Sequence, residues 1–215
     1  MAQSMPSADD AVTLADPGGA EDAARADIWG LLSQLFIAPP AQDLLERLSR
    51  AAGPGEAASG DGGPLQSAWR SVLSAAATSA ERVRDEFETL FGGTGRPEVY
   101  VYGSFYLAGA LHERPLARLR RDLTELGLGR RIDVGESEDH FALLAECMRF
   151  LIAGDDPAVC TPARQRDLFQ RHIQPWGVSM CDAIAEDRNA DFYRALAAFT
   201  REFLQIEQLA FDLLD

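Results

Sequence analysis

The chain has 215 residues, of which 47% are hydrophobic and 25% charged, which is enough apolar content for one compact folded unit and too much for a disordered chain. Its 20 basic residues are all arginine and face 34 acidic residues, so the net charge is -14. This charge would repel a phosphate backbone, and we expect no nucleic-acid partner.

The three cysteines form no CxxC pair, which indicates neither a disulfide framework nor a zinc ribbon and favours a reducing cytoplasm. The first twenty residues lack the basic start and apolar run of a secretory signal. No segment holds the roughly eighteen uncharged apolar residues that a membrane span needs. We therefore expect a cytoplasmic protein without membrane insertion.

Residues 1–20 are rich in small and polar residues and predict a flexible N-terminal tail. Residues 21–215 are expected to form one helical domain, with an N-terminal half over 21–130 and a C-terminal half over 131–215. The first helix begins near Glu21 and ends before Pro39-Pro40. Its broad apolar face carries Ile28, Leu31, Leu32, Leu35 and Phe36. A second helix is expected over 42–52.

The Gly- and Pro-rich segment 53–64 predicts a surface loop. Two amphipathic helices follow, marked by Leu65, Trp69, Val72 and Ala76 and then by Val83, Phe87, Leu90 and Phe91. After a second Gly-rich break over 92–97, Pro115 opens another helix, which Gly127 closes with a left-handed cap.

In the C-terminal third, Thr161-Pro162 predicts a helix start. Pro175 must kink or restart that helix. From Phe192 to Leu213 apolar residues recur at spacings of three and four, which predicts a long amphipathic helix. Because no segment alternates with a period of two, the predicted fold class is all-α with about nine or ten helices. Trp69 and Trp176 are assigned to the core.

The sequence has none of the short catalytic or nucleotide-binding motifs that recur in many families: no Walker, strand-linked GxGxxG, GxSxG or HExxH pattern. The three histidines and three cysteines do not have metal-ligand spacing. We therefore expect no metal, no cofactor and no catalytic residue. The basic cluster from Arg114 to Arg131 is assigned to a solvated helix face.

The segment from Gly135 to Leu151 has a distinct pattern. Ser137 is predicted to cap a helix whose first turn holds Glu138 and Asp139. His140 would lie near the positive end of that helix, where the field favours a neutral imidazole. An ordinary capped helix also explains these residues without any function.

At these residues the sequence resembles the TorD/DmsD/NarJ-type chaperones, which mature molybdenum-containing oxidoreductases. The family's E-P-x-D-H signature, followed by a helix with a Glu and a Met, is matched by Glu136, Asp139, His140, Glu146 and Met148. The family's flanking segments are resembled by 86–91 (EFETLF), 102–106 (YGSFY), 169–176 (FQRHIQPW) and 191–193 (DFY). Two positions depart from the family pattern: Ser137 replaces the signature Pro, and Gly103 stands where many members carry Glu.

The resemblance implies a TorD-like, non-enzymatic, cytoplasmic chaperone. Its partner would be the precursor of a molybdenum oxidoreductase catalytic subunit, bound through its twin-arginine signal peptide and its body while the cofactor is inserted before export. The YGSFYL segment and the Phe-rich tail look closest to relatives that accompany formate dehydrogenases. A twin-arginine signal peptide joins an arginine pair to an apolar stretch. An acidic protein with aromatic segments could bind the arginine pair through its carboxylates and the apolar stretch through its aromatic side chains.

The resemblance also implies the client-binding residues. Asp139 and His140 are expected at the client-binding cleft, where Asp139 would attract a client arginine. Glu136 would be a nearby carboxylate. Tyr102, Ser104 and Tyr106 would line the wall with their hydroxyl groups. For these three wall residues, a satisfied interior turn is an equal alternative.

Two other functions stay open. A small helical enzyme or nucleotide-binding protein could use His140 with Asp139 as an acid–base pair, although adjacent helical residues point about 100° apart. A helical adaptor could bind a partner through the stripe from Phe192 to Leu213, although such a helix more often packs on its own core. The sequence permits a monomer or a homodimer.

Overall fold

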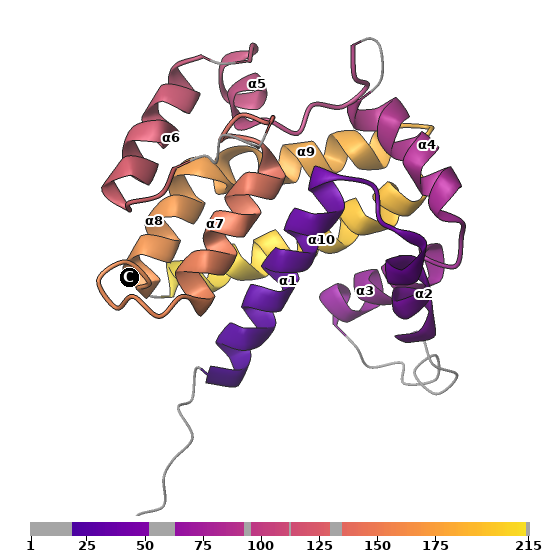
Figure 1. Cartoon of the computed structure of the whole chain (residues 1–215), viewed down its shortest axis with the longest axis horizontal. Coiled ribbons are helices and arrows are strands. Elements are labelled where there is room, and N and C mark those ends of the chain that lie inside the picture. The colour runs from indigo at the N-terminus through magenta and orange to yellow at the C-terminus, as the bar shows by residue number, and fades with distance from the viewer. Residues whose placement is uncertain (1–18, 52–62, 93–95, 112, 130–134, 214–215) are drawn as a thin grey trace, which may run out of the picture.

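The computed structural model describes residues 19–51, 63–92, 96–111, 113–129 and 135–213. Within these ranges it holds ten helices and no β-strand, which confirms the all-α prediction (Figure 1). The helices are α1 (Gly19–Ile37), α2 (Gln42–Ala51), α3 (Pro64–Ala75), α4 (Ala80–Phe91), α5 (Gly103–Ala108), α6 (Arg114–Glu125), α7 (Phe141–Ala153), α8 (Pro162–His172), α9 (Gln174–Glu186) and α10 (Phe192–Asp212).

Several expected features lie outside the described residues. They are the tail up to residue 18, most of the loop over 53–64, and the boundary between the two halves at residue 130. The first described helix begins at Gly19, two residues before the expected Glu21.

Proline and glycine set the helix ends as expected. Gly127 follows α6 with a φ of 71°, the left-handed conformation that glycine adopts without strain. The Thr161 side chain caps α8 by accepting a hydrogen bond from the backbone N–H of Arg164 at 3.3 Å. Helix α8 ends at His172 and α9 begins at Gln174, so Pro175 restarts the chain as a new helix.

Helix α1 packs along α7, and α10 packs against α3 and α9 (Figure 1). The rings of Phe36 in α1 and Phe141 in α7 meet edge-on with centroids 5.0 Å apart. Helices α5 and α6 lie at one side of this centre, and α2 and α3 lie at the opposite side. The large side chains of the centre, including Trp176, are buried as expected.

A buried ion pair fixes α1 on α10. Glu207 is 1% exposed, and its two carboxylate oxygens accept hydrogen bonds from Arg25 Nε at 2.7 Å and Nη2 at 2.9 Å. Trp29 Nε1 donates a third hydrogen bond to Glu207, at 3.1 Å. A buried carboxylate needs such partners because desolvation is costly. These contacts therefore hold α1 in register along α10.

A second long-range contact begins α10. The Glu86 carboxylate in α4 accepts hydrogen bonds from the backbone N–H groups of Asp191 at 2.8 Å, Phe192 at 3.1 Å and Tyr193 at 2.8 Å. Burial raises the pKa of Glu86, and these hydrogen bonds oppose the rise. Because the cap comes from another helix, the local sequence before α10 does not reveal it.

Candidate functional site

The loop before α7 lies against the start of α5. Tyr102 and His140 form an antiparallel backbone bridge. On either side of it, the Gly103 N–H donates to the Asp139 carbonyl at 2.9 Å, and the Phe141 N–H donates to the Val101 carbonyl at 2.8 Å. Two segments more than thirty residues apart are thereby joined by backbone hydrogen bonds.

The buried Asp139 side chain links the two segments of this junction by hydrogen bonds. Its Oδ2 accepts a hydrogen bond from the backbone N–H of Ser104 at 2.8 Å, and its Oδ1 accepts one from the Ser137 hydroxyl at 2.5 Å. The residue is 3% exposed. Its charge therefore caps the first turn of α5.

His140, not Ser137, caps α7. The Nδ1 atom of His140 accepts a hydrogen bond from the backbone N–H of Ala142 at 3.1 Å, and the helix begins at Phe141. The predicted cap at Ser137 is wrong, because that hydroxyl is bonded to Asp139. Glu138 and Asp139 accordingly precede the helix instead of forming its first turn.

The His140 imidazole is neutral near pH 7. Burial lowers its pKa to about 4, although the negative charges of Glu136 and Asp139 act in the opposite direction. Because Nδ1 is an acceptor, the ring proton of the neutral form is on Nε2. The neutral state matches the expectation, but burial, and not the helix field, is its main cause.

Tyr102 and Glu136 form the half-buried part of the site. The Tyr102 hydroxyl donates a short hydrogen bond to Glu136 Oε2. Burial, and next the bond to Glu136, raise the pKa of Tyr102. The Tyr102 ring also meets the His140 ring edge-on, with centroids 5.0 Å apart.

The first turn of α5 packs on Trp176. Tyr106 stacks on the Trp176 ring with centroids 5.6 Å apart, and its hydroxyl donates to the Tyr100 carbonyl at 2.9 Å. A Cβ atom at Gly103 would lie 2.9 Å from Trp176 Nε1. A side chain at position 103 would therefore require Trp176 to shift.

The structure thus gathers the six predicted residues around one junction and divides them into two groups. Ser104, Asp139 and His140 are buried, at 1%, 3% and 4% exposure. Tyr102, Tyr106 and Glu136 are half-buried. Asp139 does not face an open cleft as expected, because both carboxylate oxygens are engaged inside the protein.

The geometry also bears on the acid–base alternative. The Asp139 carboxylate is bonded to Ser104 and Ser137, and His140 Nδ1 is bonded to Ala142. The two side chains therefore share no proton, and no observation favours this alternative. Within the described ranges no group of three His, Cys, Asp or Glu side chains could hold a metal ion; His112 lies outside those ranges.

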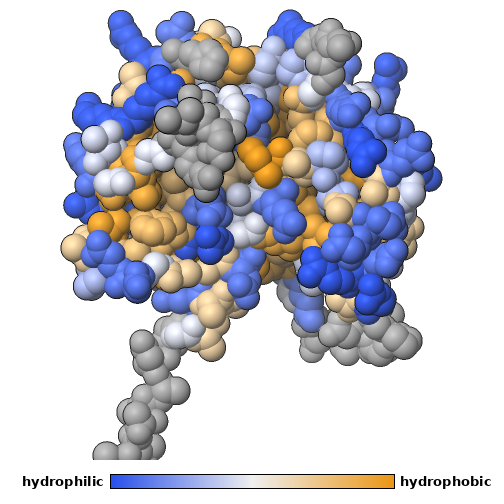
Figure 2. Space-filling model, in the orientation of Figure 1, coloured by the Kyte–Doolittle hydropathy of each residue, from blue (hydrophilic) through white to orange (hydrophobic). Residues whose placement is uncertain are grey.

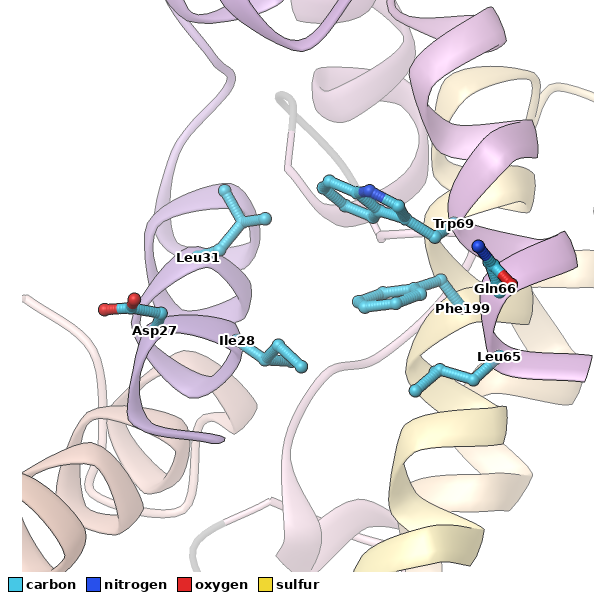
Figure 3. A pocket seen from close by; sticks show the side chains of 7 residues that line it. All are labelled: Asp27, Ile28, Leu31, Leu65, Gln66, Trp69 and Phe199. Carbon is cyan, nitrogen blue, oxygen red and sulfur yellow. The ribbon is translucent and has the colours of Figure 1, made fainter. Parts of the chain in front are cut away.

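A separate apolar cavity was not expected. It has a volume of about 370 Å³ and lies between α1 and α3, with α10 at its base (Figure 3). Trp69, assigned to the core from its sequence pattern, is half-buried and lines this cavity. The sequence does contain an indication of this cavity. Helix α1 carries Ile28 and Leu31 beside its buried residues, so its apolar surface is wider than one helix interface requires.

The family model for the nitrate reductase delta subunit matches residues 58–182, more than half of the chain. The chain belongs to this family. The match confirms the resemblance to NarJ/TorD-type chaperones and identifies the protein broadly as a redox enzyme maturation chaperone.

The fold is similar to a solved structure of a candidate redox enzyme maturation protein from Archaeoglobus fulgidus. The TM-score is 0.53 at 19% sequence identity, and the alignment covers 84% of this chain and 93% of that chain. No curated protein matches the sequence. Among the helices that the structure describes, none is long and apolar enough to span a bilayer.

Proposed function

We propose that the protein binds the twin-arginine signal peptide and the body of an apo-molybdoenzyme in the cytoplasm and assists cofactor insertion before export. The observation that carries the proposal is the junction between the loop at 135–140 and α5. In a chain of this family, the signature residues meet there beside half-buried aromatic and acidic side chains. The YGSFYL segment makes a formate dehydrogenase the first client to test.

The two groups of site residues have different roles in this proposal. Glu136 and Tyr102 contact the client, and Glu136 pairs with a signal-peptide arginine by charge-assisted hydrogen bonding. Asp139, His140 and Ser104 are positioning residues, which fix the loop on α5 through the bonds described above. Tyr106 adds an apolar wall next to Trp176.

The test is calorimetric titration of the full chain with a synthetic signal peptide from the client precursor. Glu136→Ala should weaken binding by about tenfold, the scale of one lost charge-assisted hydrogen bond. Glu46→Ala is the matched control, because it removes the same charge from an exposed pair with Arg50 on α2. Replacing both peptide arginines by alanine should weaken binding to the wild-type protein.

Two results would count against the proposal. If neither the peptide nor the precursor binds the wild-type protein, the function is wrong. If Glu136→Ala and Tyr102→Phe both retain full affinity, the function stands and this site is not the one that binds the leader. Asp139→Ala is less informative, because loss of its internal bonds would also destabilise the fold.

A further inference from the structure

The cavity between α1 and α3 is lined by apolar side chains from three helices. Ile28 and Leu31 of α1 face Leu65 and Trp69 of α3 across it, and Phe199 of α10 forms the base (Figure 3). Asp27 and Gln66 complete the lining, and Asp27 points away from the gap. The Trp69 and Phe199 rings pack with centroids 5.0 Å apart. We call these residues the α1/α3 groove.

The apolar surface continues along α10 beyond the groove. Ile206, Leu209 and Leu213 are 45%, 65% and 87% exposed. They follow Phe199 by seven, ten and fourteen residues, so they lie on the same face of the helix. The resulting track is about 21 Å long at 1.5 Å per residue. Figure 2 shows hydrophobic residues near the middle of this face of the molecule and others toward its left side, each among hydrophilic residues.

The charges beside the track are mainly negative. Glu21 lies two turns before Ile28 on α1. Glu202 lies on the track itself, one turn after Phe199 and one turn before Ile206 on α10. Neither carboxylate has an ion-pair partner among the described residues, whereas the nearby Arg25 is engaged by Glu207 and Asp22. The one basic residue of α3 is Arg70. An apolar segment with basic residues beside it complements this surface.

We propose that the α1/α3 groove and the exposed face of α10 bind the apolar stretch of the client's signal peptide as a helix. This inference rests on the proposed function and assigns a second contact surface to it. The length of the track fits about fourteen helical residues, and the groove gives such a helix a pocket for one or two anchoring side chains. Basic residues of the peptide other than the arginine that pairs with Glu136 then lie near Glu21 and Glu202.

The groove also has a built-in reporter. Of the three tryptophans, Trp29 and Trp176 are 0% and 1% exposed, whereas Trp69 is half-buried in the groove. A bound apolar helix removes water from Trp69 and should shift its fluorescence emission to shorter wavelength. Trp69→Phe should abolish this shift.

The experiment titrates the full chain with the client signal peptide and follows both heat and tryptophan emission. Leu31→Glu and Ile206→Glu should each weaken binding by about tenfold or more, because each places a charge where an apolar side chain is buried on binding. Phe150→Glu is the matched control: Phe150 is 37% exposed on α7, outside the groove. Circular dichroism melting identifies any variant that loses its fold, and Ile206 is exposed enough for its variant to keep it.

The outcomes separate the two proposals. If the peptide binds but the Trp69 emission and the affinities of both groove variants stay unchanged, the groove inference is wrong and the proposed function stands. If no peptide binds, the proposed function is wrong.

Two further results would assign the groove to another occupant and overturn the inference. A shift of Trp69 emission in the peptide-free variant Leu14→Asp would assign the groove to the chain's own N-terminal segment. A shift that depends on protein concentration and accompanies dimerisation would assign it to a second copy.

Discussion

His140 should make the free energy of unfolding fall as the pH is lowered from about 6.5 to about 4. In the folded protein, burial lowers the pKa of His140 to about 4, whereas an unfolded chain has the ordinary value of about 6.5. Between these values the unfolded state binds a proton that the folded state does not. Stability from His140 is therefore complete above about pH 6.5 and is lost as the pH falls towards 4.

The size of the effect follows from the pKa difference. The drop in the pKa of His140 from about 6.5 to about 4 corresponds to a limit of about 3 kcal/mol, most of which is lost by pH 4.5. His140→Asn removes the titrating group but keeps a side-chain acceptor for the Ala142 N–H, since asparagine is a good N-cap. Other titrating residues are common to both proteins, so the difference between the two proteins reports His140 together with its interactions with Glu136 and Asp139.

The assay is urea unfolding of both proteins at pH 7.5 and pH 4.5, followed by circular dichroism. The wild-type protein should lose about 2 to 3 kcal/mol more than His140→Asn over this interval. Equal losses in the two proteins would refute the reasoning. So would a pKa near 6.5 for His140 measured by NMR in the folded protein.

Two stability predictions concern close packing and buried charge. Gly103→Ala should destabilise the protein by about 1–3 kcal/mol in urea unfolding, because the new Cβ would lie 2.9 Å from Trp176 Nε1. Arg25→Ala should cost about 3 kcal/mol or more, because it leaves the Glu207 carboxylate, at 1% exposure, without its cation.

Each of these two substitutions has a control. Gly129→Ala adds a Cβ with no atom within 4 Å and should change stability by less than about 0.5 kcal/mol. Arg201→Ala breaks an ion pair with Asp182 in which both side chains are 48% exposed, and it should cost less than about 1 kcal/mol. If a test variant and its control lower the free energy of unfolding by the same amount, burial does not determine the loss of stability.

Part of the site could be predicted from its sequence pattern. The signature residues and the YGSFY segment identified the two stretches that meet at the junction. The roles of single residues could not be predicted, because Asp139 bonds to Ser104, which is thirty-five residues away. Serine is a residue type that often caps helices, but the Ser137 hydroxyl donates its hydrogen bond to Asp139. His140 accepts the hydrogen bond from the backbone N–H of Ala142 and caps the helix instead. The groove at Trp69 was indicated only in part: the apolar face of α1 is wide, but periodicity does not show what covers such a face.

The amino-acid sequence by itself determined the all-helical class, the positions of most helices and the restart at Pro175, because helix periodicity and the backbone limits of proline and glycine act over a few residues. The tertiary structure alone decided which carboxylates are interior. Glu207 pairs with Arg25 and Glu86 caps α10 from positions far along the chain. Such pairings arise when helices pack, so no local pattern encodes them.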